Sequence, residues 1–330
     1  MKIEDLNRTQ RLSVNIDSSN MVLEKLLGKD YSEYRKVWEQ AGEQGNKPPA
    51  FPVHLDLELQ DSCNQSCVMC PRNKENHQNL PYGLNLKDTA QIESLKTIIS
   101  EGAELGLKSI NFGAFSEPLL HKGLWDLISY SHHNGIVDSR VITNGLLLSR
   151  YIDEIFDSNL RHLFISLDAF SEQTYKQIRG VGYKKILENI DTLLEERSRR
   201  NSTLPLVRVS FVEMDVNRHE KQSFVDFWSK KVDFVDIQEW SDYTDKVDLS
   251  SFTDVPKKFN CRSPWQRLSV LANGDIIPCC DFNGRALKLG NTNSDNLLSV
   301  WNSKEMNDVR LNITNDNSSV CSSCQRGKGI

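Results

Sequence analysis

The sequence predicts an α/β protein in which a parallel sheet of six strand–helix units precedes a small C-terminal hairpin-and-helix segment. From residue 53 to about residue 240, short apolar runs alternate with amphipathic helical stretches. This alternation is typical of parallel strands joined by right-handed crossovers. After residue 241 the alternation stops, and Asn273-Gly274 lies between two apolar runs. Asn-Gly in that setting is a strong signal for a β-hairpin.

The six strands and their helices follow one another along the chain. The expected strands are Val53–Leu59, Ser109–Phe112, Asp138–Thr143, Leu163–Leu167, Val207–Val212 and Phe234–Gln238. The expected helices are Thr89–Leu105, Leu124–Asn134, Tyr151–Ser158, Ser171–Gln177, Tyr183–Arg200 and Glu220–Lys230. Six units are too few for a closed eight-stranded barrel. In such sheets, ligands bind at the carboxyl ends of the strands.

Residues 1–50 are predicted to form a helical preface. Apolar and aromatic residues between Leu23 and Trp38 recur at near-helical spacing in a charged background. The proline-rich run Lys47–Pro52 then breaks the helix before the first strand. We expect the preface to cover one end of the main domain.

Composition excludes several classes of protein. The chain has 330 residues, 38% of them hydrophobic, and a formal net charge of −5, which gives no electrostatic basis for binding nucleic acid. No apolar run is long enough to span a membrane, and the N-terminus lacks the layout of a signal peptide. We therefore expect a cytoplasmic protein, in which the eight cysteines are better interpreted as metal ligands than as disulfides.

Three cysteines directly after the first strand indicate a metal cluster. Cys63, Cys67 and Cys70 have C-x3-C-x2-C spacing, and no histidine is closer than His77. A structural zinc site usually takes four protein ligands, so a stray zinc site is the weaker alternative. A [4Fe–4S] cluster held by three thiolates has one iron open for another ligand.

This cysteine loop resembles that of the radical S-adenosylmethionine (SAM) enzymes. The resemblance implies a partial (β/α)6 TIM-like barrel whose cluster binds SAM and cleaves it to a 5′-deoxyadenosyl radical, which then removes hydrogen from a substrate. It also implies an electron donor such as flavodoxin or ferredoxin. Met69, before the third cysteine, occupies a position that lies against adenine in the family.

Other strand-end motifs extend the resemblance. Glu117-Pro118 resembles the Gly-Gly-Glu-Pro motif that binds the SAM amino group, although Phe115-Ser116 departs from the glycine-rich pattern. The alternative for Glu117 is a plain helix-start carboxylate. Asn144 and Ser166, after the third and fourth strands, would bond the ribose or carboxylate of SAM. Asp168 and Arg179 could instead cap a helix, and Asp168 could touch substrate.

The remaining five cysteines lie near the C-terminus. Cys261, Cys279, Cys321 and Cys324 could complete a site with no open position, and a zinc ribbon is the serious rival. Cys280 should face away if residues 279 and 280 continue a strand. The pattern resembles the SPASM domain of radical SAM enzymes or its shortened form, twitch, with gap lengths like those of the aminocyclitol dehydrogenase of butirosin biosynthesis. Five cysteines then support one auxiliary [4Fe–4S] cluster.

The resemblance implies three domains and a class of reaction. The domains are the preface (1–50), a radical SAM core (51–240) and a SPASM/twitch domain (241–330). We expect oxidation or epimerisation of a sugar, aminocyclitol or related metabolite, with the auxiliary cluster as electron acceptor. The alternatives are modification of a ribosomal peptide and a non-catalytic, zinc-stabilised binding module.

Overall fold

One mixed sheet organises the molecule. The computed structural model describes residues 12–14, 16–42, 47–73, 85–239, 261–315 and 319–322. In this part of the chain the sheet has ten strands in the order β1-β7-β6-β5-β4-β3-β2-β8-β9-β10. The strands are β1 Leu12–Val14, β2 His54–Leu57, β3 Ser109–Phe112, β4 Asp138–Thr143, β5 His162–Ser166, β6 Leu206–Glu213, β7 Phe234–Glu239, β8 Arg267–Val270, β9 Asp275–Ile277 and β10 Gly290–Asn291.

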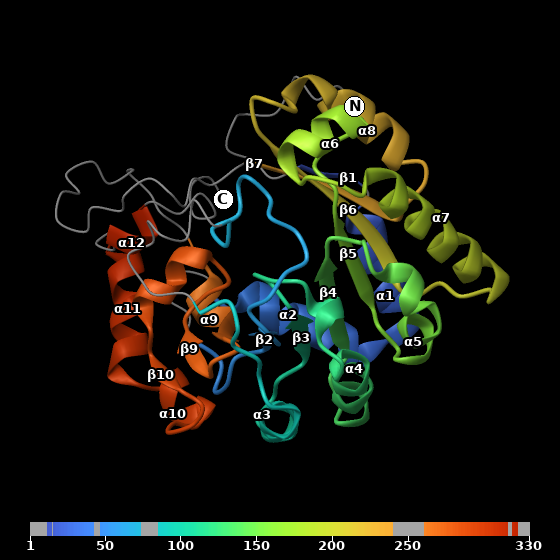
Figure 1. Ribbon diagram of the computed structural model, residues 1–330. Helices are drawn as coiled ribbons and strands as arrows, with labels where there is room; N and C mark the ends of the chain where they lie inside the picture. Colours follow the sequence, from blue (N-terminus) through green and yellow to red (C-terminus); the bar gives the residue numbers. More distant parts are fainter. Residues whose placement is uncertain are drawn as a thin grey trace.

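Strands β2 to β7 run parallel, each paired with the next along the chain. The helices that connect or follow them cover the outside of the sheet (Figure 1). They are α3 Ile92–Glu104, η3 Pro118–Leu120, α4 Leu124–His133, η4 Leu148–Arg150, α5 Ile152–Asp157, α6 Glu172–Ile178, α7 Tyr183–Arg199, η5 Arg218–Glu220 and α8 Lys221–Trp228. Since the sheet order does not close on itself, the predicted α/β fold with a partial barrel is confirmed.

Alternate residues along the strands divide the sheet into two faces. Leu55, Leu57, Ile110, Val141 and Leu163 belong to the hydrophobic core that packs against the helices. Because side chains alternate in a strand, the residues between them face the inside of the partial barrel. The inner face is therefore the face on which a ligand would lie.

The preface contains two helices and an unpredicted strand. Helices α1 (Ile16–Leu27) and α2 (Lys29–Gln40) have the expected helical structure. Tyr34 and Trp38 of α2 contact Asp138 and His54, at the amino ends of β4 and β2. The all-helical expectation is wrong for β1, which pairs antiparallel with β7. A three-residue strand carries too little periodicity to be recognised, and its partner lies more than 200 residues away.

The C-terminal hairpin forms at Asn273-Gly274 as predicted, with Gly274 at a φ of 86° and β8 antiparallel to β9. However, β8 also pairs in parallel with β2, so the hairpin extends the main sheet. The pairing satisfies the backbone groups of an otherwise open edge of β2. The other C-terminal elements are α9 Ser263–Gln266, η6 Phe282–Leu287, α10 Leu297–Trp301, α11 Lys304–Thr314 and α12 Ser319–Ser322.

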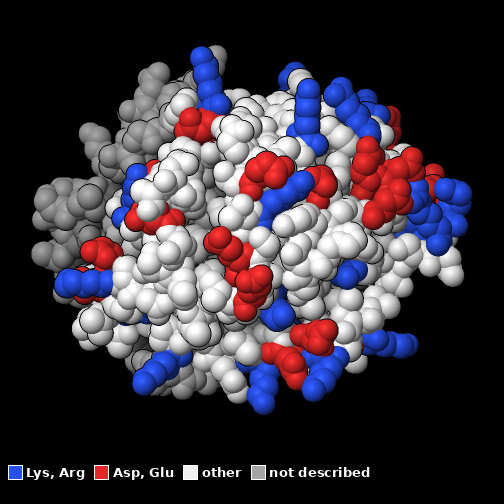
Figure 2. Space-filling view, turned by 90° about the horizontal axis from the view of Figure 1, so that it is seen from below, with Lys and Arg blue, Asp and Glu red and all other residues white. Residues whose placement is uncertain are grey.

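The surface charges are mixed. On the face shown in Figure 2, acidic and basic side chains lie near one another in small groups among uncharged residues. This arrangement agrees with the small net charge of −5. Among the described helices, none is both long enough and apolar enough to cross a membrane.

Candidate radical SAM and auxiliary cluster sites

The loop after β2 places Cys63, Cys67 and Cys70 at the carboxyl end of the sheet. A backbone hydrogen bond from Cys70 N to Cys67 O closes a turn between the second and third cysteines. An N–H donor lies near each sulfur. The three donors are Asn144 Nδ2 at 4.0 Å from Cys63 Sγ, Arg179 Nη1 at 3.6 Å from Cys67 Sγ and Arg72 N at 3.4 Å from Cys70 Sγ.

These surroundings fit an iron–sulfur cluster. Burial raises the pKa of the Cys63, Cys67 and Cys70 thiols. Free thiols in this loop would therefore stay protonated, and metal binding would supply the positive charge that releases their protons. N–H donors at the sulfurs are the outer contacts that tune cluster thiolates. The loop thus suits a [4Fe–4S] cluster with three protein ligands; His77 lies outside the described residues.

Buried charges hold both ends of the cysteine loop. Arg72 donates to the backbone oxygen of Asp61 and, at 2.5 Å, to its carboxylate. Arg72 also forms an ion pair with Glu58 at 3.9 Å. The Glu58 carboxylate accepts hydrogen bonds from the backbone N–H groups of Ala114 and Phe115 and from the Ser116 hydroxyl. Two strand-end loops are therefore connected through one carboxylate.

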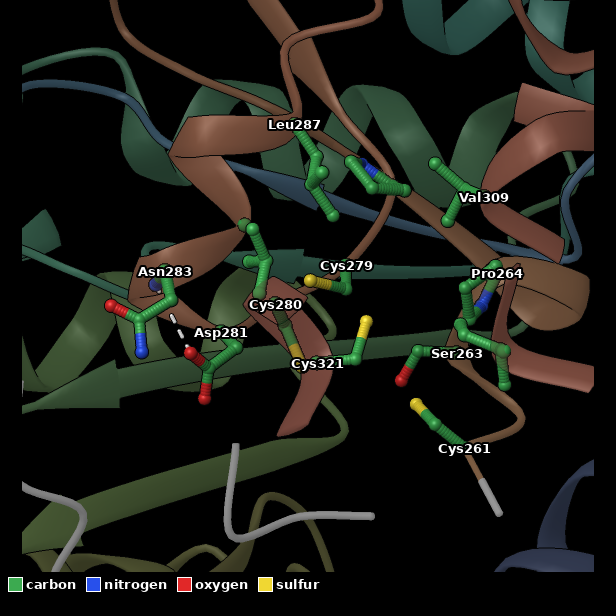
Figure 3. A pocket seen from close by; sticks show the side chains of 14 residues that line it. Cys261, Ser263, Pro264, Cys279, Cys280, Asp281, Asn283, Leu287, Val309 and Cys321 are labelled. Atoms are coloured by element: carbon green, nitrogen blue, oxygen red, sulfur yellow. Dashed lines mark hydrogen bonds between the residues drawn. The ribbon is translucent and has the colours of Figure 1, made fainter. Parts of the chain in front are cut away.

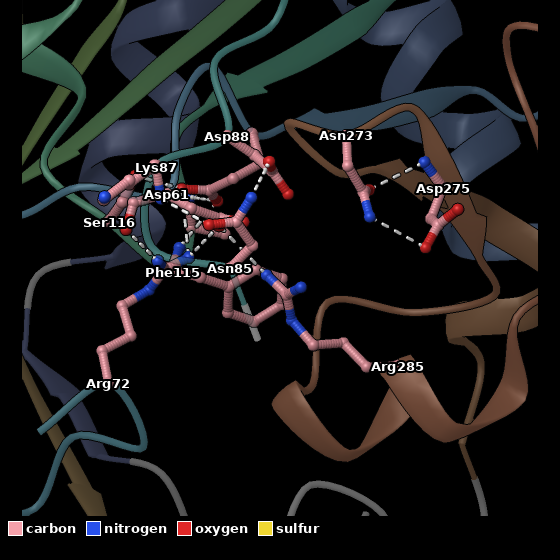
Figure 4. Close-up of polar contacts among 12 residues, drawn as sticks. Asp61, Arg72, Asn85, Lys87, Asp88, Phe115, Ser116, Asn273, Asp275 and Arg285 are labelled. Carbon is pink, nitrogen blue, oxygen red and sulfur yellow. Dashed lines mark hydrogen bonds and ion pairs between the residues drawn. The ribbon is translucent and has the colours of Figure 1, made fainter. Parts of the chain in front are cut away.

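Arg285 of η6 links the C-terminal segment to the same charges. Its Nη2 atom lies 3.3 Å from Asp61 Oδ1, the oxygen that also accepts from Arg72 Nη2, and the two arginines approach it from different directions in Figure 4. Its guanidinium lies 5.3 Å from the ring centre of Phe115 and 5.0 Å from that of Phe282, and the two rings meet edge to face. The cysteine loop and the C-terminal cysteine segment therefore share a buried contact.

Glu117 is 1% exposed and lies at the start of η3. Its carboxylate accepts hydrogen bonds from Thr143 Oγ1 at 2.7 Å, Asn144 N at 2.8 Å and Leu119 N at 3.1 Å. Burial raises the pKa of Glu117 to about 7, although these hydrogen bonds act in the opposite direction. The Glu117 carboxylate therefore caps the start of η3, the alternative that the sequence left open. It also joins η3 to the end of β4 through Thr143 and Asn144.

The other residues predicted to contact SAM differ in whether their polar atoms already have hydrogen-bond partners within the chain. Asn144 Nδ2 donates to Asn64 Oδ1 at 2.6 Å, which ties the end of β4 to the cysteine loop. Ser166 is the last residue of β5 and is half-buried, and no described residue hydrogen-bonds its hydroxyl. Met69 is half-buried between Val68 and Cys70. Among the described residues, the Ser166 hydroxyl therefore has no partner and is available to a ligand.

Asp168 and Arg179 form a buried ion pair beside the loop. Arg179 Nε and Nη2 lie 2.7 and 2.5 Å from Asp168 Oδ2. The sequence offered helix capping or substrate contact for Asp168 and a helix-end position for Arg179. Arg179 does follow the last residue of α6, but its side chain turns toward Cys67.

The C-terminal cysteines line one pocket. Cys261, Cys279, Cys280 and Cys321 all contribute to it, with apolar walls that include Val309 and Leu287 (Figure 3). Burial raises the pKa of Cys261 and raises that of Cys279 well above its usual range, so these thiols, too, need a metal to become thiolates. Cys324, the fourth predicted ligand, lies outside the described residues.

The expectation that Cys280 faces away from this site is wrong. It assumed that residues 279 and 280 continue a strand, in which neighbours alternate. Strand β9 instead ends at Ile277, and Pro278 to Cys280 form a bend. The alternation rule does not hold in a bend, so Cys279 and Cys280 line the same pocket.

Several residues at these sites were missed by sequence reasoning. Glu58 is a charged residue at an inner-face position of an apolar run, so strand alternation could have identified it. Arg72 and Arg285 carry no local signal, because their partners come from other segments of the chain. Their roles follow from tertiary contacts.

Comparison with protein families identifies the class. The radical SAM superfamily model matches residues 57–211, and a model of the iron–sulfur cluster-binding SPASM domain matches residues 261–325. The chain belongs to the radical SAM superfamily and carries a C-terminal SPASM domain. The predicted class of enzyme and its cofactors, [4Fe–4S] clusters and SAM, are thereby confirmed.

Curated relatives match part of the chain. A GTP 3′,8-cyclase of Thermodesulfovibrio yellowstonii is 29% identical over 184 residues, which are 55% of this chain and 53% of the relative. A GTP 3′,8-cyclase of Alkaliphilus metalliredigens is 32% identical over 143 residues, 43% of each chain. The chain thus spans about half the length of these curated relatives.

Solved structures show the same fold at low identity. SuiB of Streptococcus suis, bound to its precursor peptide SuiA, matches with a TM-score of 0.62 at 16% identity, over 92% of this chain and 75% of SuiB. BtrN in complex with AdoMet and 2-DOIA matches with a TM-score of 0.53 at 14% identity, over 82% of this chain and 92% of BtrN. These matches describe the fold of the chain.

Proposed function

We propose that this enzyme oxidises or epimerises a carbon atom of a small polar metabolite, such as a sugar or an aminocyclitol, with one auxiliary [4Fe–4S] cluster as electron acceptor. The main support is the polarity of the inner face of the partial barrel. Each central strand places at least one hydrogen-bonding side chain there. They include Asp56, Asn111, Arg140, Ser166, Ser210, Asp236 and Gln238.

Many of these groups are already held by one another, which fixes their positions. Asn111 Nδ2 donates to Asp56 Oδ1 at 3.0 Å, and Gln238 Nε2 donates to Asp236 Oδ2 at 2.7 Å. Asn111 Oδ1, by contrast, is buried with no hydrogen-bond partner among the described residues. An acceptor that stays unpaired costs free energy, so this face favours a substrate that carries hydroxyl or amino groups. This argument favours a polyhydroxylated metabolite.

At the carboxyl ends of the strands, different described residues would bind the cluster and SAM. Cys63, Cys67 and Cys70 would hold the catalytic cluster. When bound, this cluster supplies an electron that cleaves SAM, SAM supplies the radical that removes hydrogen from carbon, and the auxiliary cluster takes up the substrate electron. Ser166 would offer SAM its hydroxyl, to which no described residue forms a hydrogen bond. Glu117 Oε2 accepts one hydrogen bond from Asn144 N and has a second lone pair for the SAM amino group.

Met69 would lie against the adenine ring, where its polarizable thioether favours contact with an aromatic system. The electron donor would be a flavodoxin or a ferredoxin. The cytoplasmic location stays a prediction. These assignments follow from the family resemblance together with the positions of the residues around the cysteine loop.

The C-terminal cysteines would hold the auxiliary cluster. Cys261, Cys321 and either Cys279 or Cys280 converge on the pocket, and Cys324 would complete the ligands. Single substitutions to alanine decide between the two neighbours. We expect Cys279→Ala to lose the auxiliary cluster and Cys280→Ala to keep it, by resemblance to the Gly-x4-Cys spacing. The reverse result would make Cys280 the ligand.

The reaction class is tested with anaerobically reconstituted protein, SAM and dithionite. Deuterated sugars and aminocyclitols, synthetic peptides and GTP are offered separately, and deuterium in 5′-deoxyadenosine is measured. We expect deuterium transfer from a sugar or an aminocyclitol. Transfer from a peptide or from GTP alone would overturn the proposal and assign the enzyme to that substrate class.

Two variants test the role of the inner face. Gln238→Leu should raise KM for the substrate about tenfold or more, because a substrate hydroxyl or amino group that pairs with the Gln238 amide would be buried without a partner. Gln222→Leu, on the exposed side of α8, is the matched control and should leave KM unchanged. Equal KM values for both variants would remove Gln238 from the substrate site.

A further inference from the structure

Arg179 contacts a sulfur of the cysteine loop through a side-chain nitrogen. Two contacts fix the end of α6 against this loop. Val68 N donates to Ile178 O at 2.9 Å, and Gln65 Nε2 donates to the Tyr175 hydroxyl at 2.6 Å. The backbone of Arg179 is therefore positioned by the same segment that carries Cys67.

Asp168 orients the guanidinium. It binds Nε and Nη2 of Arg179 through Oδ2, which leaves Nη1 directed at Cys67 Sγ, 3.6 Å away. Asp168 is itself fixed, because Oδ1 accepts from Val212 N at 2.8 Å and its carbonyl accepts from Asn217 Nδ2 at 2.9 Å. Its φ of 59° is unusual for a residue other than glycine and is maintained by these contacts.

A fixed charge in this position acts on the electron affinity of a cluster. Three thiolates already give such a site excess negative charge, and one-electron reduction adds more. A buried cation and an N–H···S contact stabilise the reduced form, because burial weakens solvent screening. The Asp168 carboxylate is completely buried and offsets part of this effect.

We propose that Arg179, oriented by Asp168, sets the reduction potential of the catalytic cluster through Cys67. Arg179 is thus a positioning residue: it acts through Cys67 on the transfer of an electron into the cluster. The inference deepens the proposed function and rests on the assignment of Cys63, Cys67 and Cys70 as cluster ligands.

The test is a potentiometric titration followed by electron paramagnetic resonance, using the cluster signal that changes when SAM is added. Arg179→Met should lower the equilibrium constant for one-electron reduction at least tenfold, which corresponds to about 59 mV. Arg179→Lys keeps the charge and should stay within about threefold of the parent. Asp168→Asn removes the opposing charge but keeps an acceptor oxygen, so its potential should rise.

Arg197→Met is the matched control. Arg197 also pairs with an aspartate, Asp233, at 2.5 Å, but it lies near the amino ends of β6 and β7. Its substitution should leave the potential unchanged. The inference is overturned if Arg179→Met retains the parent potential, if Arg179→Lys and Arg179→Met shift it equally, or if Asp168→Asn lowers it.

The iron content of each variant is measured in parallel. If a variant loses the SAM-responsive cluster, the substituted residue has a structural role. The variants that keep the cluster would still decide whether the reduction potential rises or falls as proposed. Absence of any SAM-responsive signal in the parent protein would instead refute the assignment of the cysteine loop, which separates that failure from failure of the inference.

Discussion

Replacing Glu117 by glutamine tests how burial of one carboxylate affects both stability and SAM binding. The folded-state pKa of Glu117 is about 7, raised by burial from an ordinary value of 4.5. A carboxyl with a raised pKa contributes stability that is fully present below the unfolded-state value. The contribution is lost as the pH rises through the folded-state value, because the charged form is less favourable inside the protein.

At about 1.4 kcal/mol per pKa unit, this group costs the folded state about 1.4 kcal/mol near pH 5.5 and about 3.3 kcal/mol near pH 8. Glutamine has no such dependence. Relative to Glu117→Gln, the parent apoprotein should therefore lose about 2 kcal/mol of unfolding free energy between these pH values.

Urea unfolding of both apoproteins at the two pH values measures the difference. Exposed Glu104 provides the matched control, Glu104→Gln, which should show no comparable pH-dependent difference. A constant difference between parent and Glu117→Gln would refute the reasoning that Glu117 ionises at a cost. Equilibrium dialysis of the reconstituted variant adds the second role: loss of a charge-assisted hydrogen bond to the SAM amino group should weaken binding about tenfold or more.

Three further outcomes are expected. Replacing Cys63, Cys67 and Cys70 together by alanine should leave one [4Fe–4S] cluster and abolish 5′-deoxyadenosine formation with dithionite, and persistent formation would refute the catalytic-cluster assignment. Metal analysis of the reconstituted parent should give about eight irons and eight sulfides, whereas four irons with one bound zinc would support a C-terminal zinc ribbon. Arg285→Met should lower the free energy of unfolding by about 3 kcal/mol, because it leaves the Asp61 charge with one buried partner fewer; an unchanged urea midpoint would contradict this.

The order of strands and helices was determined by the sequence itself. Apolar periodicity and turn residues are local, so the six parallel strands and the Asn273-Gly274 hairpin could be predicted from short windows. The cysteine spacing likewise indicated a cluster held by three thiolates within eight residues, and the resemblance of this loop to that of the radical SAM enzymes indicated the class of enzyme.

Only the tertiary structure decided which distant groups meet. The pairing of β8 with β2, the contact of Arg285 with Asp61 and the approach of Arg179 to Cys67 each join segments separated by more than 100 residues. Cys280 lines the auxiliary pocket because the strand stops at Ile277 and residues 278 to 280 form a bend. Such contacts depend on burial and on the pairing of charges in three dimensions, and no local pattern of residues encodes them.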